Sequence, residues 1–338
     1  KKIINENNNN NNNKQRNNMN IKKIGLTALA ASLVSVSAYA GEMSVAGSAK
    51  VGIKNNAGNS GGKSITMGNQ LTFTGGGELD NGINVALSFV LDQGDGVTAA
   101  SAPFDSHSIT ISSDAMGSIV IAGEGAGNAQ SALDTTAAGD IWDNGFKHGM
   151  AETAYVAMAG SDASGSSINY TLPTLMEDLA ITASYSPSGA AVVSTTAVGF
   201  TYTGVEGLSV SYGAGEAGST TATASGDITT MKGSYAIGSF TAAYSNTESD
   251  KDSTGIDEEM TSFKLSYTVT DDLSISYGED THETSGQTVD EEFDAITVSY
   301  TTGGMTITAA QYDAKGLNNV TGTLGEAARW KLKTSFAF

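Results

Sequence analysis

The sequence contains no cysteine and only 3 prolines among its 338 residues. The lack of cysteine excludes both a disulfide framework and a thiolate metal site. Aromatic residues make up only 7% of the chain, whereas 41 residues are glycine and much of the rest is serine, threonine and alanine. This composition is typical of strands and turns, so we expect stability to come from hydrogen bonding and burial within an all-β fold.

Basic residues are also scarce, with 17 lysines and arginines against 36 acidic residues and a formal net charge of −19. Residues 1–40 hold six of the basic residues and one of the acidic residues, so the remainder carries 11 and 35 and a net charge of −24. Binding to a nucleic-acid backbone requires clustered lysine and arginine. The charge therefore excludes nucleic acid as a partner.

No apolar run reaches the roughly 18 residues that a transmembrane helix requires. The first 18 residues are rich in asparagine and have low complexity, and we expect no function for them. Residues 19–40 read as a secretory signal peptide, with two lysines, an apolar stretch over 24–36 and an A-x-A cleavage motif that ends at Ala40. We expect the exported protein to begin at Gly41.

Residues 41–338 show a strict two-residue alternation of apolar and polar side chains, which indicates strands with chemically different faces. We count sixteen such segments. Tight turns such as 80–82 alternate with long polar links such as 125–164, 246–259 and 281–291. This arrangement predicts a sixteen-stranded antiparallel transmembrane β-barrel with short periplasmic turns, long outer loops and an outer-membrane location.

Two other all-β folds are weaker interpretations. A soluble sandwich also alternates, but it buries one apolar face of each sheet and needs neither an even strand count nor an export signal. A calcium-binding solenoid would show a fixed nonapeptide period, which this sequence lacks. Both comparisons favour the barrel.

Tyrosines give independent geometric information about this barrel. If the first strand starts on the periplasmic side, eight tyrosines fall into two girdles near the membrane surfaces. The outer girdle comprises Tyr185, Tyr212, Tyr244 and Tyr277, and the inner girdle comprises Tyr202, Tyr235, Tyr267 and Tyr300. The first five strands have no outward tyrosine and several small residues, including Gly47, Ala49 and Gly75. We expect that wall to face other subunits in a homotrimer or a similar oligomer.

The residues after Gly41 also resemble a known family. The opening strand over 43–50, MSVAGSAK, and the terminal strand over 330–338, WKLKTSFAF, are similar to those of the general diffusion porins of Gram-negative bacteria, most closely the alphaproteobacterial type. The C-terminal Phe338 looks like the family's assembly signal. The segment Gly139-Asp140-Ile141-Trp142 is similar to the third loop that folds into such barrels and narrows them, although the Pro-Glu-Phe-Gly-Gly element of enterobacterial relatives is absent.

This resemblance implies passive diffusion of small hydrophilic solutes and ions, with outer-membrane lipids and lipopolysaccharide as further partners. In the family, an acidic third loop faces basic side chains on the barrel wall, and such charges tune which ions pass. The excess of acid here suggests a weak cation preference. The candidate constriction residues are Asp134, Asp140, Asp143 and Glu152 on the loop, and Lys50, Arg329, Lys331 and Lys333 on the wall. Lys232 and Lys264 project from other polar strand faces, where a solvated position without a special role is equally compatible with the sequence.

A calcium site is a weak alternative, and no other cofactor is expected. Asp250 and Asp252 match the first and third positions of a calcium loop, but Thr261 occupies the twelfth, where a bidentate glutamate is required. A solvated acidic loop explains these residues better. His107, His148 and His282 are isolated in the sequence, which makes a histidine metal site improbable.

Three other functions remain open from the sequence. A substrate-specific channel would have a dedicated site in the third loop, where Trp142 and Phe146 would form an aromatic slide. The long loops would also suit a surface adhesin or phage receptor. An enzyme is not expected, because the sequence has no G-x-S-x-G elbow and no convincing catalytic set.

Overall fold

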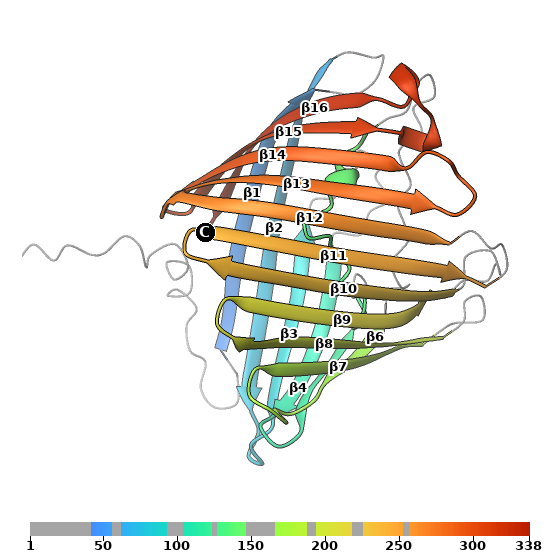
Figure 1. Cartoon of the computed structure of the whole chain (residues 1–338). Coiled ribbons are helices and arrows are strands. Elements are labelled where there is room, and N and C mark those ends of the chain that lie inside the picture. The colour runs from blue at the N-terminus through green and yellow to red at the C-terminus, as the bar shows by residue number, and fades with distance from the viewer. Residues whose placement is uncertain are drawn as a thin grey trace, which may run out of the picture.

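Sixteen antiparallel strands form a closed barrel in which each strand pairs with its neighbours in sequence and the last strand pairs with the first (Figure 1). The computed structural model describes residues 42–55, 62–92, 104–123, 127–146, 166–187, 194–217, 226–252 and 257–338. The sixteen-stranded barrel predicted from the sequence is confirmed. The predicted signal peptide, Gly41 and Glu152 lie outside the described residues.

The strands differ in length, from 5 residues in β6 to 16 residues in β2. Their bounds are β1 (Glu42–Asn55), β2 (Lys63–Glu78), β3 (Asn84–Asp92), β4 (Phe104–Ser113), β5 (Gly117–Ala122), β6 (Ser167–Thr171), β7 (Leu179–Ser186), β8 (Thr195–Val205), β9 (Leu208–Ala217), β10 (Gly226–Ile237), β11 (Phe240–Lys251), β12 (Glu258–Thr270), β13 (Leu273–Thr284), β14 (Glu291–Thr302), β15 (Met305–Lys315) and β16 (Ala327–Ala337). Three short 3-10 turns complete the described structure: η2 (Ile141–Asp143), η3 (Leu317–Asn319) and η4 (Gly322–Leu324). Within the described ranges, no helix is long and apolar enough to cross a membrane.

The two faces of the wall follow the predicted alternation. All eight girdle tyrosines point outward from β7 to β14, with 38% to 46% of each side chain exposed. The outward Tyr244 pairs with Phe263, whereas the next pair, Ser245 and Ser262, is buried on the inner face. An apolar outer face and a hydroxyl-rich inner face reverse the pattern of a soluble protein and suit a wall between lipid and water.

The outer strand ends extend further than the polar sequence suggested. Parts of the links predicted over 246–259 and 281–291 are strand, because β11 reaches Lys251, β12 begins at Glu258 and β13 reaches Thr284. Polar residues in these segments still alternate between the two faces, and backbone hydrogen bonding between neighbouring strands is satisfied whatever the side chains are. Hydrophilicity therefore overestimated the length of these loops.

The barrel closes where β1 meets the C-terminus. The backbone N–H of Gly47 donates to the carbonyl of Phe338 at 2.7 Å, and the N–H of Phe338 donates to Gly47 at 3.0 Å. A Cβ atom on Gly47 would lie within 3 Å of the Phe338 ring. A side chain at position 47 would displace the last aromatic ring, which packs directly over the backbone of the first strand.

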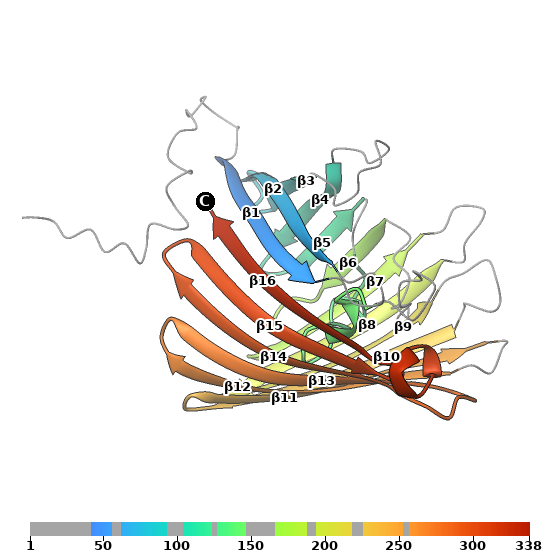
Figure 2. The ribbon, with the colours of Figure 1, turned by 90° about the horizontal axis from the view of Figure 1, so that it is seen from above.

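The interior contains a small apolar core as well as polar wall. Figure 2 shows η2, in green, inside the ring of strands. Around it lie apolar residues from the third loop, the inner faces of β14 and β15, and the last outer loop. The buried members of this cluster are Ile141, Phe146, Phe293, Ala295, Ala314 and Leu317.

Candidate functional site: the channel constriction

The described part of the third loop, residues 127–146, runs along the inner wall of the barrel. Inward side chains of β6, β7 and β10 to β13 form hydrogen bonds with this segment. The segment is therefore held by individual hydrogen bonds spread around the wall. These contacts are Asn169 Nδ2 to Gly127 O at 3.1 Å, Ala129 N to Ser184 Oγ at 2.9 Å, Gln130 Nε2 to Thr230 Oγ1 at 2.9 Å, Ala137 N to Ser245 Oγ at 2.8 Å, Ala138 N to Ser262 Oγ at 2.9 Å, and Ile141 N to Asp280 Oδ2 at 2.7 Å.

Glycines on the wall make room for the loop between these contacts. A Cβ on Gly199 of β8 would lie 2.6 Å from the carbonyl oxygen of Ala129. A Cβ on Gly278 of β13 would lie 2.8 Å from the Cβ of Ala138. Both distances are too short for a real side chain, so the loop approaches the wall as closely as glycine allows.

Asp280 provides the most buried of these anchors. Its side chain is fully buried and accepts the backbone N–H of Ile141, and it also interacts with the hydroxyls of Ser262 and Thr136. These donors offset part of the cost of burying a polar carboxyl group. No pattern in the sequence predicted this anchor. The available signal was a single carboxylate among the small inward residues of β13.

The other end of the described segment is held by Arg329 of β16. Its guanidinium donates to the carbonyl of Asn144 and, through Nε, to the carbonyl of Asn55 at 3.1 Å. Arg329 was predicted to line the pore, but only 3% of it is exposed. Arg329 therefore supports the loop backbone and does not present a free charge to the channel.

The three described loop carboxylates occupy different environments. Asp134 is partly buried, and this burial, with the nearby charge of Asp140 and against the opposing effect of Lys232, raises its pKa to about 6. Asp140 has a left-handed backbone, with φ of 53°, and its Oδ1 accepts the N–H of Thr136 at 2.8 Å. Asp143 lies in η2 and is exposed.

Lys232 of β10 lies beside these carboxylates. Its Nζ donates to the carbonyl of Thr135 at 2.6 Å, and its charge interacts with those of Asp134, Asp140 and the neighbouring Lys264. The sequence left open whether Lys232 was only a solvated wall residue. Its contact with the loop backbone gives it a defined position on the same wall as the acidic loop.

The remaining basic candidates gather at the seam between β1 and β16. Direct cross-strand partners share a face, and Lys331 pairs with Lys54, Lys333 with Gly52 and Lys50 with Ser335. The charge of Lys333 is repelled by those of Lys50 and Lys331. The predicted grouping of these three lysines on one inner face is therefore present, without Arg329 as a free member.

The alternative sites have less structural support. Asp250 lies within β11 opposite Asp227, and residues 253–256 of the predicted calcium loop lie outside the described residues. The part of the chain that the structure describes has no group of three or more metal-ligating side chains. Phe146 is fully buried against Phe293, with ring centroids 5.5 Å apart, so it cannot form the aromatic slide suggested with Trp142.

The barrel and its inward loop agree with the comparison of the sequence with known families. A family model described as Gram-negative porin matches residues 25–320. The chain belongs to the Gram-negative porin family. This porin is accordingly a diffusion channel of the outer membrane, and no curated protein matches its sequence.

Solved porins share the fold of this porin at low sequence identity. A porin structure refined at 1.8 Å resolution has 16% identity and a TM-score of 0.64, and the match covers 88% of this chain and 100% of that one. The anion-selective porin from Comamonas acidovorans has 13% identity, a TM-score of 0.66 and coverage of 88% and 99%. A mutant of the Rh. blastica porin has 13% identity, a TM-score of 0.60 and coverage of 88% and 100%.

Proposed function

We propose that this porin passes small hydrophilic solutes and ions with a weak preference for cations. The observation that supports this preference is the charge of the third loop, whose residues 127–146 include Asp134, Asp140 and Asp143 but no lysine or arginine. These carboxylates lie on a segment held inside the barrel, where a passing ion is closest to the protein. An acidic element at this position lowers the energy of a cation and raises that of an anion.

The preference is weak because basic side chains lie in the same channel. Lys232 lies next to Asp134 and Asp140, and the seam carries Lys50, Lys331 and Lys333 as a second charged element. The acidic loop and the lysine seam lie on different sides of the barrel interior. Their opposite charges produce a field across the channel and leave a small net charge. Both ion signs can pass such a channel, with modest discrimination.

Reversal potentials in a salt gradient test this assignment. Asp140→Asn with Asp143→Asn should reduce or reverse the cation preference, and Lys331→Gln with Lys333→Gln should increase it. Asparagine at 140 keeps the side-chain oxygen that accepts the Thr136 N–H, so the loop should keep its position.

The matched control is Asp250→Asn with Asp252→Asn, which removes two carboxylates near the outer end of β11. Charges that face open water are screened over about 10 Å at 0.1 M salt, so this variant should behave like the wild type. An equal change in the control and in the loop variant would show that diffuse charge at the mouth, and not the loop, sets selectivity.

The same channel measurements separate general diffusion from a substrate-specific channel. General diffusion requires a current that stays ohmic and a solute flux that does not saturate. Saturation by one solute would instead require a binding site. The proposal includes no enzymatic activity. The hydroxyls of Ser245 and Ser262 and the carboxyl of Asp280 accept backbone N–H groups of the third loop and so hold it in position.

The assembly proposed for this porin is a homotrimer built on the first strands. The outward face of β1 to β3 is hollowed by about 1020 Å³ near the periplasmic turn, with Gly75 and Gly77 among its lining residues. Phe73 and Phe89 stack in this hollow with ring centroids 4.7 Å apart. A concave apolar face without tyrosines suits close packing against a second copy better than contact with lipid headgroups.

Gly75→Trp tests this surface, because it would fill the hollow and block a neighbouring subunit. The matched control is Gly233→Trp on the outward face of β10, where the nearest atom to a new Cβ is 3.9 Å away. Mild detergent gels should show monomers for the first variant and trimers for the second. Trimers in both variants would place the subunit contact on another wall.

Contact with lipopolysaccharide through divalent cations is the other proposed partner interaction. Glu279, Asp294 and Asp313 stand directly opposite one another on the outward faces of β13, β14 and β15, above the outer tyrosines. Like charges in this register repel, and of the three carboxylates the Tyr277 hydroxyl contacts only Glu279 and Asp294, so a bound cation would relieve the remaining repulsion. Calcium should therefore stabilise the lipopolysaccharide-bound protein less after Asp294→Asn than after Asp272→Asn at the opposite, periplasmic end. Equal stabilisation of the two variants would refute this interaction.

A further inference from the structure

The last outer loop, residues 316–326 between β15 and β16, folds into the mouth of the barrel. Its residue Leu317 is only 1% exposed and belongs to the same apolar cluster as Ile141 and Phe146 of the third loop. The strand residues of this cluster, which include Phe293 and Ala314, lie on the inner faces of β14 and β15. The third loop and the last loop therefore meet inside the channel around one core.

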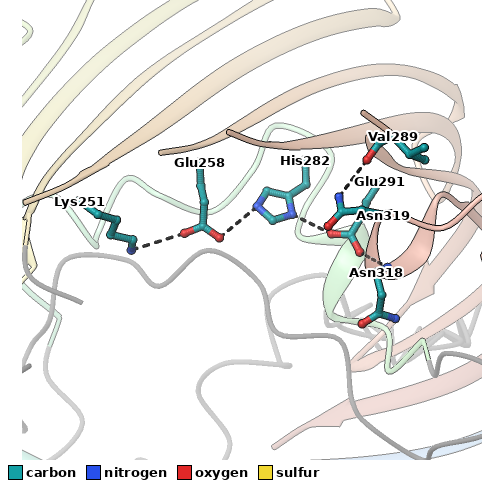
Figure 3. A network of polar contacts seen from close by, with 7 residues as sticks. All are labelled: Lys251, Glu258, His282, Val289, Glu291, Asn318 and Asn319. Carbon is teal, nitrogen blue, oxygen red and sulfur yellow. Dashed lines mark hydrogen bonds and ion pairs between the residues drawn. The ribbon is translucent and has the colours of Figure 1, made fainter. Parts of the chain in front are cut away.

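A chain of polar contacts holds the last loop in this place (Figure 3). Glu291 of β14 accepts the backbone N–H of Asn318 at 2.5 Å through Oε1, and its Oε2 is 2.8 Å from Nδ1 of His282. The other ring nitrogen of His282 is 3.5 Å from Glu258, whose second oxygen is 3.4 Å from Nζ of Lys251. Residues of three neighbouring strands, β11 to β13, thus support the carboxylate of β14 that binds the loop.

The shape of the loop depends on contacts of this kind. Asn318 and Asn319 have consecutive positive φ angles of 55° and 59°, a left-handed conformation that asparagine adopts as a single residue but seldom twice in succession. The side chain of Asn319 donates to the carbonyl of Val289 at 2.9 Å, next to the Glu291 contact. Such a backbone persists only where its surroundings hold it. Without Glu291, the first turn of the loop would lose its main support.

We propose that the last outer loop is a second narrowing element of the channel and that Glu291 is its positioning residue. The proposal rests on the channel function of the family and is independent of the proposed cation preference and trimer. The third loop narrows the channel along the wall from β6 to β13, and the last loop narrows the mouth at β14 to β16. Release of the last loop should enlarge the open cross-section without changing the charge of the third loop.

Removal of the loop tests whether it narrows the channel. Leu317 N donates to Gly325 O at 3.1 Å, and the Cα of Gly316 is 3.5 Å from a Cβ on Gly325, so the loop ends lie side by side. Deleting residues 317–324 joins Gly316 to Gly325 without displacing a strand. Single-channel conductance should rise above that of the wild type, because removal of the loop widens the mouth of the channel. Unchanged conductance would overturn the proposal.

Point variants test the role of Glu291. Glu291→Ala should give the conductance of the deletion variant, or switch between that level and the wild-type level. Glu291→Gln keeps an oxygen that accepts the Asn318 N–H and should stay close to wild type. The matched control is Glu292→Ala, because Glu292 is the next residue of the same strand but is exposed on the outer face. Equal conductance of the Glu291→Ala and Glu292→Ala variants would exclude the positioning role.

A thiol reporter detects loop release directly, because the chain has no cysteine of its own. Thr323→Cys places one thiol in η4 of the last loop. Its mobility, measured by spin label, should increase when Glu291→Ala is added and should not change with Glu292→Ala. Barrel folding is checked for each variant by its faster migration on unheated gels. If Glu291→Ala fails this check, the deletion variant decides the proposal.

Discussion

The pKa of Asp134 predicts a pH-dependent ion preference. With a pKa of about 6, this carboxyl is about 97% ionised at pH 7.5 and about 3% ionised at pH 4.5. Lowering the pH therefore removes one negative charge from the third loop inside the barrel. For an ion that passes at ~6 Å in a water-like dielectric, one unit charge is worth ~0.7 kcal/mol, or about threefold in local concentration. The effect has opposite signs for cations and anions, so their permeability ratio should fall by up to about tenfold.

Reversal potentials measured in a potassium chloride gradient, at equal pH on both sides, give this ratio. The wild type should lose cation preference along a titration curve centred near pH 6. Asp134→Asn should show the low-pH preference of the wild type at every pH between 5 and 7. A step of unchanged size near pH 6 in this variant would refute the assignment, because another group would then carry the titrating charge.

Three further predictions concern the packing that shapes the channel. Gly47→Val should weaken closure of the barrel, because its side chain would displace the Phe338 ring, and unheated gels should show less fast-migrating folded protein than the wild type. Gly199→Val should displace the third loop from the wall at Ala129, and conductance should differ from that of the wild type while the barrel still folds. Asp280→Ala should remove a buried hydrogen bond worth about 0.5–1.5 kcal/mol and increase open-channel noise, and wild-type noise would argue against its anchoring role.

The strands were predictable because their signal is local. Alternation with a period of two depends only on which side of the wall each residue faces, and lipid and water impose opposite preferences on the two sides. Tyr244 and Phe263 can therefore be assigned to the outer face from sequence, as can the inward serines beside them. The ends of the strands were less predictable. Above the membrane both faces meet water, so Glu248 and Asp250 look like loop residues although they lie in β11.

The channel interior was predictable only in part. The lysine seam follows from barrel closure alone, since β1 must lie beside β16 in any closed barrel. The roles of Arg329, Asp280 and Glu291 do not follow from closure. Each of them contacts a loop residue more than 25 positions away, and no local pattern specifies which inward polar residue a loop will meet.

The sequence by itself determined the class of this protein: an all-β barrel with a lipid-facing outer wall, a polar interior and an acidic third loop. These properties depend on composition and on a two-residue period. Tertiary structure alone decided how the interior is filled. The residues that shape the interior matter only where two distant segments come into contact. They are Gly199, Gly278, the buried Asp280, and Phe146 and Leu317 in their shared core. Packing inside the barrel is set by these long-range contacts, because steric fit depends on both partners.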